Sequence, residues 1–362
     1  MSAAIPNPEW WVGRRVFVTG HTGFVGGWLC AWLMRMGARV TGYALAPPTQ
    51  PSFCALTDLA KSLDRDVRAD VRDASALRSA VEAADPQVVL HLAAQPIVRE
   101  AWREPAETFA VNVMGTVNVL ETCRGREALE RIVVYTTDKV YRNDQSGRAF
   151  GEDDALGGNE PYSASKAAAD WAARAYWESY FRGASPRPAL AIVRAGNIIG
   201  GGDWSADRLL PDAVRAFGGG DALTVRSPAA TRPWQHVADA VRGTLLIAER
   251  PASDDDIAWN LGPRRGESHS VAEVADEVAQ AWGEGARWRP VGDGTIPESR
   301  ALVLSSERAA LRLGWECAWG LRRSVGASVE WYKAALGGKG DLLALTQRQI
   351  AEHLAEVARV PA

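Results

Sequence analysis

The sequence predicts an α/β protein with a doubly wound parallel sheet and a smaller C-terminal substrate-binding part. Short apolar runs rich in β-branched residues alternate with longer helical patterns, and this alternation loosens after about residue 197. The runs also lack the polar alternation of a half-exposed strand, which indicates strands buried on both faces. In such sheets the ligand binds at the carboxyl ends of the strands.

The predicted elements follow in order along the chain. Five runs are expected to form strands: RVFVTG (15–20), ARVTGYAL (38–45), QVVLHLA (87–93), RIVVYTT (131–137) and ALAIVRAG (189–196). Apolar residues at three- and four-residue steps predict helices at 26–37, 74–84, 105–124 and 162–181, and shorter ones at 236–249 and 270–282. We expect a Rossmann-like part at 13–197, with later segments interleaved, and a mainly substrate-binding part at 198–345.

Composition excludes several classes of protein. The formal net charge is -3, and no run of Lys and Arg builds the basic face that nucleic-acid binding needs. The four cysteines are widely separated and lack the spacing of a disulfide framework or a metal site, so we expect reduced thiols and no bound metal. The chain opens without a signal-peptide pattern, and no segment approaches the ~20 apolar residues of a transmembrane helix. These features predict a cytoplasmic protein.

A glycine motif joins the first strand to the first helix. VFVTGHTGFVG contains Gly20, Gly23 and Gly26, where any side chain would hold the backbone away from a pyrophosphate at the helix N-terminus. This context predicts a Rossmann-like dinucleotide site. The second strand ends GYALAPPT, without the acidic residue that binds the ribose of NAD, so this rule leaves NAD and NADP open. Asp70 follows a probable third strand and is either an adenine contact or a solvated turn carboxylate.

A second motif supplies an acid–base pair. Tyr162 and Lys166, in PYSASK, are four residues apart at the start of a helix and project from one face. An ammonium near the phenol lowers its pKa, and a tyrosinate can take a proton from an alcohol. Thr137 ends the fourth strand and adds a hydroxyl. The non-catalytic alternative is a tyrosine that packs in the protein with a surface lysine nearby by chance.

The ordered set TGHTGFVG, HLAAQ, TTDKVY and YSASK resembles the extended short-chain dehydrogenase/reductase superfamily over about residues 13–333. The resemblance implies a nucleotide-sugar enzyme with NAD as cofactor. The resemblance further implies that Thr137 positions a sugar hydroxyl and that Tyr162 removes its proton. Lys166 would adjust the pKa of the tyrosine and hold the nicotinamide ribose. The cofactor contacts that it implies are Gly20, Gly23, Phe24, Gly26, Asp70, Val71, Leu92, Ala93, Ala94, Tyr162 and Lys166.

The residues after Thr137 resemble the 4,6-dehydratase arrangement, with Lys139 in a place where glutamate is usual. Together with GGNEPYSASK, RAGNIIGGGDWSADRLLPD and TRPWQHV, this variant is similar to the CDP-glucose 4,6-dehydratases. The likeness implies CDP-glucose as substrate, Asp138 as the acid for O6 and Lys139 as the base for C5. A lysine acts as a base only when part of it is neutral; if Lys139 stays charged, it would stabilise the enolate instead. A loop salt bridge between Asp138 and Lys139 is the structural alternative.

The same likeness assigns residues to the nucleotide diphosphate. It gives Arg232 to the pyrophosphate and Asn197 to a phosphate. Asp203 and Arg208, in GGDWSADR, are substrate contacts or exposed loop charges. Arg194 either binds ligand or braces a loop, and His236 is expected to be a helix-start residue. Family likeness also implies a homodimer through the helices Glu107–Cys123 and Tyr162–Phe181.

Other functions stay open at this point. The chain could be a dehydratase acting on another nucleotide sugar, or a C4 epimerase; Asp138 argues against the epimerase, because epimerisation needs no acid at O6. It could also be a non-catalytic NAD-binding protein, and the presence of both Tyr162 and Lys166 argues against this.

Overall fold

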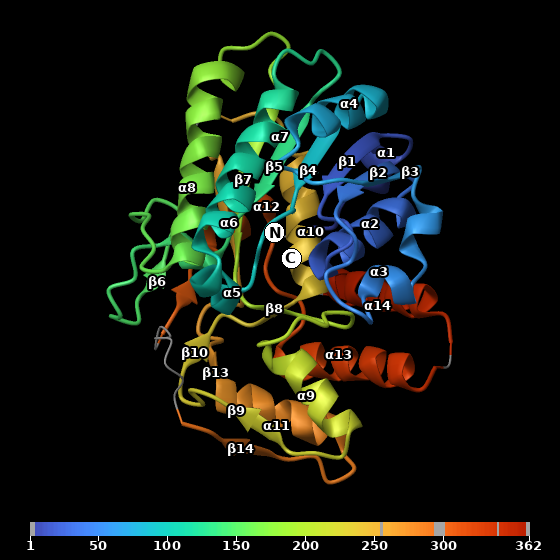
Figure 1. The fold of residues 1–362 in the computed structure, drawn as a ribbon, viewed down its shortest axis with the longest axis vertical. Coiled ribbons are helices and arrows are strands. Elements are labelled where there is room, and N and C mark those ends of the chain that lie inside the picture. The colour runs from blue at the N-terminus through green and yellow to red at the C-terminus, as the bar shows by residue number, and fades with distance from the viewer. Residues whose placement is uncertain (1–3, 254–255, 293–300, 339, 360–362) are drawn as a thin grey trace.

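The computed structural model describes residues 4–253, 256–292, 301–338 and 340–359. At its centre lies a seven-stranded sheet with the order β12-β7-β5-β4-β1-β2-β3, in which neighbouring strands are parallel (Figure 1). The strands are β1 (Arg15–Thr19), β2 (Arg39–Ala44), β3 (Arg65–Arg68), β4 (Val88–His91), β5 (Arg131–Tyr135), β7 (Ala189–Ala195) and β12 (Ala258–Leu261). The chain leaves β1 toward one edge and returns to build the other, which confirms the doubly wound α/β fold.

The five predicted runs coincide with β1, β2, β4, β5 and β7. The other two strands have weaker patterns. The edge strand β3 has the sequence RDVR and is largely exposed, so the sequence only suggests it as a probable strand before Asp70. The strand β12 has four residues, AWNL, and was missed because it lies in the loosely patterned later half of the chain.

The inner strands of the sheet are mainly apolar because both of their faces are covered. Along β1, Val16 and Val18 belong to one apolar cluster and Phe17 to another; along β4, Leu90 and Val89 divide in the same way. Alternate side chains of a strand point to opposite faces, so each cluster fills one side of the sheet. Helices α2 (Phe24–Arg35), α10 (Val237–Glu249) and α14 (Leu342–Arg359) contribute to the first cluster, and α4 (Ala74–Ala84), α7 (Gly115–Cys123) and α8 (Pro161–Tyr176) to the second.

The helix that carries Tyr162 and Lys166 begins at a strong N-terminal signal. The Glu160 side chain accepts hydrogen bonds from the backbone N–H groups of Tyr162 and Ser163, both at 2.7 Å, and Pro161 occupies the first helical position. The predicted helix 162–181 consists of α8 and a π-helical end, η4 (Trp177–Phe181). The predicted helix 105–124 consists of α6 (Pro105–Phe109), a π-helical turn η2 (Ala110–Met114) and α7.

A second layer lies beyond the carboxyl ends of the strands, in the lower half of Figure 1. It contains α9 (Leu209–Gly218), α11 (Val271–Trp282), α13 (Leu321–Leu336), β9 (Leu223–Val225) and β14 (Trp288–Pro290). Since α10 and β12 belong to the sheet layers although they follow residue 197, the later chain interleaves with the first part. The division at 197/198 into two functional parts stays a prediction.

The remaining elements are short and connect these layers. They are α1 (Pro8–Trp11), α3 (Phe53–Leu56), α5 (Val98–Arg103), α12 (Glu307–Leu313), η1 (Leu59–Ser62), η3 (Asp138–Val140), β6 (Ala149–Phe150), β8 (Ile198–Ile199), β10 (Thr231–Arg232), β11 (Gln235–His236), β13 (His269–Ser270) and β15 (Val303–Leu304). The four cysteines are buried free thiols. None of the described helices has the length and apolar character needed to cross a membrane.

Candidate active site

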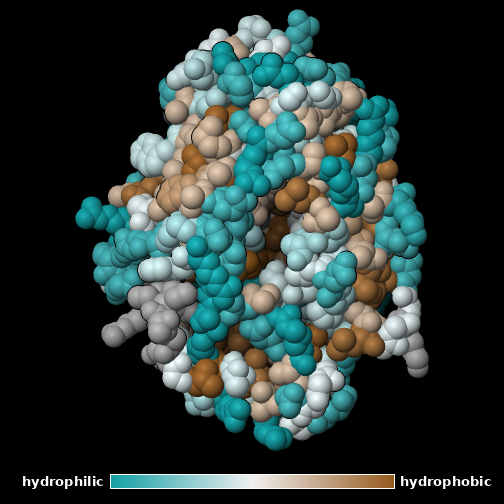
Figure 2. Space-filling view, viewed as in Figure 1, coloured by the Kyte–Doolittle hydropathy of each residue, from teal (hydrophilic) through white to brown (hydrophobic). Residues whose placement is uncertain are grey.

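A cavity of about 1750 Å³ opens at the carboxyl ends of the central strands, between the sheet and the second layer. Figure 2 shows this face hollowed near its centre. A site for one drug-sized ligand has roughly 300–1,000 Å³, so this cavity has room for two nucleotides. Its lining includes the site residues predicted from the sequence: Gly20, Gly23, Phe24, Gly26, Asp70, Val71, Leu92, Ala93, Ala94, Thr137, Asp138, Lys139, Tyr162, Lys166, Asn197, Asp203, Arg208 and Arg232.

The glycine loop has the shape that a pyrophosphate needs. Gly20 has φ +79°, and a Cβ there would lie 2.7 Å from the Ala93 backbone nitrogen. A Cβ on Gly26 would lie 2.2 Å from the Gly20 carbonyl oxygen, so both positions exclude a side chain. Gly23 is the N-cap of α2, whose first amides have no partner within the helix. Because the loop lines the cavity, these amides and the helix dipole suit an anionic group there.

The segment after β4 lies against this loop. Thr19 accepts hydrogen bonds from the backbone N–H groups of Leu92 and Ala93, both at 3.1 Å, and so joins the ends of β1 and β4. At the rim, Asp70 is 2.6 Å from Arg72, which holds the pKa of the Asp70 carboxyl below its usual value. Asp70 is therefore an ion-paired carboxylate at the edge of the cavity.

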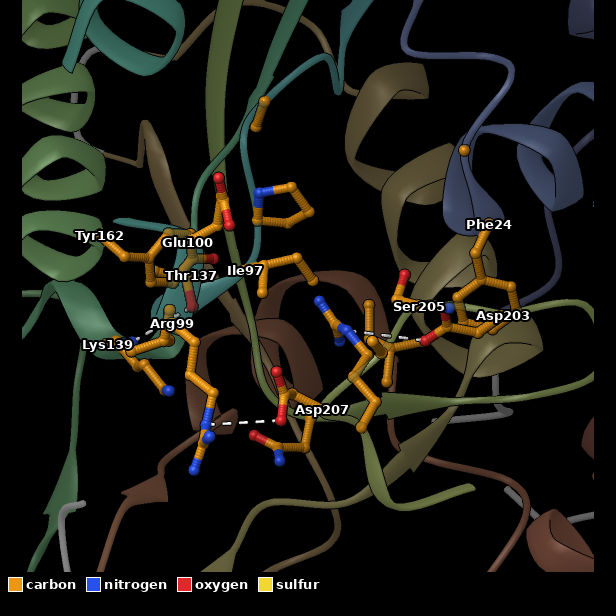
Figure 3. A pocket seen from close by; sticks show the side chains of 18 of the residues that line it. Phe24, Ile97, Arg99, Glu100, Thr137, Lys139, Tyr162, Asp203, Ser205 and Asp207 are labelled. Atoms are coloured by element: carbon orange, nitrogen blue, oxygen red, sulfur yellow. Dashed lines mark hydrogen bonds and ion pairs between the residues drawn. The ribbon is translucent and has the colours of Figure 1, made fainter. Parts of the chain in front are cut away.

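The redox candidates lie on one wall. Figure 3 shows Tyr162, Thr137 and Lys139 on one side of the cavity, with Phe24 and Asp203 opposite. The Lys166 ammonium donates to the Tyr135 carbonyl at 2.8 Å, and burial lowers the pKa of Lys166 to about 8. Burial raises the pKa of Tyr162 to about 12, against the opposing effects of Thr137 and Arg208. The expectation of a lowered phenol pKa was therefore wrong, because desolvation outweighs the favourable charges.

The elimination candidates occupy the turn η3. The Thr137 hydroxyl donates to Asp138 Oδ1 at 2.9 Å, while Asp138 Oδ2 is buried without a hydrogen-bond partner among the described residues. Burial raises the pKa of Asp138, although Lys139, Thr137 and Arg232 act in the opposite direction. The Lys139 Nζ lies 6.0 Å from the centre of the Tyr162 ring. The cavity thus holds a carboxyl whose pKa is raised by burial, next to a cation.

The four predicted substrate contacts face the same space. Arg232 is nearly buried on β10 and donates to the Thr231 carbonyl at 2.9 Å. Asn197 lies two residues after the end of β7. Asp203 accepts from the Ser205 backbone N–H at 3.0 Å, and its other oxygen lies 3.7 Å from Arg208 Nε. Asp203 is buried, so it is more than an exposed loop charge.

Residues 16–262 match the model of the NAD dependent epimerase/dehydratase family. The chain belongs to this family. Its cofactor is NAD, and the glycine loop, the α2 N-terminus and the size of the cavity fit that cofactor. The chain is 39% identical over 359 residues, 98% of its length and 99% of the relative's, to the CDP-glucose 4,6-dehydratase of Salmonella typhimurium.

Two solved structures resemble the chain over most of its length. MoeE5 in complex with UDP-glucose and NAD has a TM-score of 0.75 and 26% identity, and the match covers 89% of this chain and 99% of MoeE5. The Thermus thermophilus UDP-glucose 4-epimerase in complex with NAD has a TM-score of 0.77 and 25% identity, with the same two coverages. The fold of this epimerase/dehydratase family member is therefore that of proteins solved with NAD.

The sequence analysis did not predict two groups of residues, one that lines the cavity and one that holds the segments beside it. Asp207 lies 3.4 Å from Arg99 Nε and 3.0 Å from Arg226 Nη2, and so joins α5 to the second layer across the cavity (Figure 3). Asn112, at the π-helical turn, accepts from the Gln95 backbone N–H at 2.8 Å and donates to Ser165 Oγ at 2.9 Å. No local spacing marks either group; the apolar pattern around Asn112 only indicated an ordinary helix.

The structure also resolves two alternatives left by the sequence. Arg194 is fully buried and paired with Asp170, so it braces the protein interior. His236 is the N-cap of α10, and its Nδ1 accepts from the Ala238 backbone N–H at 3.1 Å, as expected for a helix-start residue.

Proposed function

We propose that this family member is a CDP-glucose 4,6-dehydratase, which converts CDP-D-glucose to CDP-4-keto-6-deoxy-D-glucose for deoxysugar and polysaccharide biosynthesis. One observation carries the proposal. The turn directly after Thr137 brings a buried, protonatable Asp138 and the cation Lys139 into the same cavity as Tyr162 and Lys166. The 39% identity to the Salmonella typhimurium CDP-glucose 4,6-dehydratase, over nearly the full chain, supports it independently.

NAD, when bound, supplies a reversible acceptor for the hydride of the sugar. The residues that would hold it are Gly20, Gly23, Phe24 and Gly26 around the pyrophosphate, Asp70 and Val71 at the adenine end, Leu92, Ala93 and Ala94 between them, and Tyr162 and Lys166 at the nicotinamide ribose.

The first step assigned to these residues is removal of the O4 proton. Thr137 orients the sugar hydroxyl, and Tyr162 takes its proton as C4 becomes a carbonyl. Thr137 and Arg208 favour the phenolate form of Tyr162, since both lower its pKa against the effect of burial. Because Tyr162 is buried, the electrostatic effects of Thr137 and Arg208 on its phenol are stronger than they would be in water.

The second step is loss of water across C5 and C6, after which return of the hydride to C6 and of a proton to C5 gives the 4-keto-6-deoxy sugar. The new C4 carbonyl acidifies the hydrogen on C5, which Lys139 removes in its neutral form, while the neutral carboxyl of Asp138 protonates the departing O6. Asp138 suits this task because burial raises its pKa and its Oδ2 has no hydrogen-bond partner among the described residues. If Lys139 remains charged, it stabilises the enolate by its charge and another group takes the proton.

The substrate is a nucleotide sugar, and its diphosphate requires cations in the cavity. Arg232 and Asn197 bind the phosphates, where a guanidinium gives paired charge-assisted bonds. Asp203 orients Arg208, and the two line the sugar and diphosphate region. The choice of CDP-glucose among nucleotide sugars follows from the likeness to the Salmonella typhimurium relative.

The protein acts as a cytoplasmic homodimer in this proposal. Large apolar side chains are exposed on α5, α6, η2, α8 and η4: Trp102, Phe109, Met114, Trp171 and Tyr180. These elements pack side by side, and apolar colour gathers over α7 and α8 in Figure 2. Monomeric proteins rarely leave an apolar face of this kind uncovered, and a second copy of the helices would cover it.

The test is conversion of a panel of nucleotide sugars. Purified protein with NAD is incubated separately with CDP-, dTDP-, UDP- and GDP-linked hexoses, and the alkaline absorbance of a 4-keto-6-deoxy sugar is followed, with Tyr162→Phe as the inactive control. The proposal expects a signal with CDP-glucose. A signal with another nucleotide alone would overturn the substrate, and a 4-epimerised product without the keto signal would overturn the reaction.

A further inference from the structure

Arg194, at the end of β7, contacts two elements that carry site residues. Its Nε and Nη2 donate to Asp170 Oδ2 and Oδ1 at 2.7 and 3.0 Å, which makes a bidentate ion pair. Its Nη1 donates to the Tyr141 hydroxyl at 2.8 Å. Arg194, Asp170 and Tyr141 are all buried. One guanidinium therefore links α8 to the residue that directly follows η3.

These two links lead to the two halves of the proposed chemistry. Asp170 lies one helical turn after Lys166 on α8, the helix that also carries Tyr162. Tyr141 directly follows η3, the turn that carries Asp138 and Lys139. Arg194 thus connects the helix of the oxidation residues with the turn of the elimination residues. It does so from outside the lining of the cavity that both groups share.

Tyr141 is fixed from its other sides as well. Its hydroxyl donates to Asn260 Oδ1 at 2.6 Å, so it uses its proton there and accepts from Arg194. Its ring stacks on Phe150 with centroids 5.2 Å apart and planes 7° from parallel. Asn260 pairs with Arg194 in the register of β12 and β7. The end of the turn therefore has little freedom to move relative to β7.

Stability alone does not account for this ion pair. Two charges removed from water lose their hydration, and apolar residues of similar size often serve a fold as well or better. A sugar that reacts at C4 and then at C5 and C6 must meet both groups of residues without being released. Catalytic side chains must lie within about 0.5 Å of their productive positions. A rigid polar connection between α8 and η3 meets that requirement.

We infer that Arg194 is a positioning residue which, through Asp170 and Tyr141, fixes the elimination pair Asp138 and Lys139 relative to the oxidation residues on α8. The inference rests on the proposed function. Arg194 itself does not touch the substrate, so its effect is on the relative rates of two steps and on kcat, with little effect on KM.

The decisive variant is Tyr141→Phe, which removes one hydroxyl and leaves the Arg194–Asp170 pair intact. On mixing with CDP-glucose and NAD, oxidation at C4 is expected within about twofold of wild type, while elimination slows by up to about 100-fold. Since the cofactor is reoxidised only after water has left, its reduced form should accumulate and be seen by absorbance. Arg194→Lys, whose single ammonium cannot span both partners, should slow both steps.

Two controls separate positioning from general loss of structure. Tyr176→Phe removes a tyrosine hydroxyl of α8, which donates to Glu121 at 2.9 Å. Ile350→Ala removes a fully buried side chain of α14 and should lower the melting temperature. Both should keep the wild-type ratio of oxidation to elimination.

The outcomes divide cleanly. A selective loss of elimination in Tyr141→Phe, with a wild-type ratio in the controls, supports the inference. Equal slowing of the two steps, no slowing at all, or the same altered ratio in Ile350→Ala would overturn it. Wild-type conversion of CDP-glucose is measured beside the variants and tests the proposed function, whereas the ratio of steps tests the positioning role, so either can fail alone.

Discussion

The Thr137 hydroxyl donates a hydrogen bond to the Asp138 carboxylate across 2.9 Å. The residue assigned to the sugar hydroxyl thus contacts the residue assigned as the acid, and one Asp138 oxygen is already occupied. The second oxygen, Oδ2, is buried and has no partner among the described residues. Burial raises the pKa of Asp138, which increases the share of the protonated form that can donate a proton to O6.

Asp138→Asn should therefore separate activity from stability. Elimination should be lost, because an amide cannot deliver a proton, while oxidation at C4 persists. A carboxyl whose folded pKa is raised contributes stability below its unfolded pKa and loses it as the pH rises through the folded value. At about pH 7 the variant should be more stable than wild type, and the gain should shrink toward about pH 4. Thermal melts across this range, beside the turnover assay, check both parts; a variant less stable than wild type at neutral pH contradicts the assigned burial effect.

Lys139 is tested by two substitutions. Lys139→Ala should keep NAD binding and lose elimination by at least about 100-fold. Lys139→Arg keeps the charge and cannot act as a base at ordinary pH. If the charge stabilises the enolate, the arginine variant should retain much of the activity that alanine loses; if Lys139 is the base, both variants should be equally inactive. Stopped-flow absorbance of the reduced cofactor distinguishes a loss of elimination from a loss of oxidation. Unchanged turnover in Lys139→Ala would remove the lysine from the mechanism.

The sequence predicted the parts of this site that depend on local spacing. The glycines at 20, 23 and 26 and the pair Tyr162 and Lys166 each lie within one turn or loop, so their proximity follows from secondary structure. The alternation of strands and helices then places both motifs at one edge of a parallel sheet.

Properties set by tertiary packing could not be predicted. Asp207 meets Arg99 and Arg226, which lie on separate layers and share no sequence pattern. The direction of the Tyr162 pKa depends on burial, which outweighs the local charges that the sequence displays. Likewise β12 pairs with β7 although more than 60 residues separate them along the chain.

Lys166 should leave a signature in the dependence of stability on pH. Burial lowers its folded pKa to about 8, whereas the unfolded side chain keeps its proton to about 10.4. The unfolded state therefore binds more protons between these values, and stability rises with pH over this window. Relative to Lys166→Met, wild type should gain up to about 3 kcal/mol between about pH 8 and pH 10. Urea unfolding of both proteins at several pH values measures the difference; parallel curves would contradict a lowered pKa.

The proposed homodimer is tested at Trp171. Its side chain is 60% exposed on α8, beside the other apolar side chains of that face. Trp171→Glu places a charge in the proposed interface and should shift the protein from dimer to monomer in size-exclusion chromatography with light scattering. Leu311→Glu, at a site that is 62% exposed on α12, is the matched control and should leave the mass unchanged. A monomeric wild type, or a Trp171→Glu protein that remains dimeric, contradicts this interface.

The most direct test follows one hydrogen atom through the reaction. CDP-glucose carrying deuterium at C4 is converted with NAD, and the label is located in the product by NMR. With oxidation at C4 assigned to Tyr162 and Lys166 and elimination to Asp138 and Lys139 in the same cavity, we expect a 4-keto-6-deoxy product with deuterium on C6. A product that carries the deuterium on C4, or none at all, would contradict it.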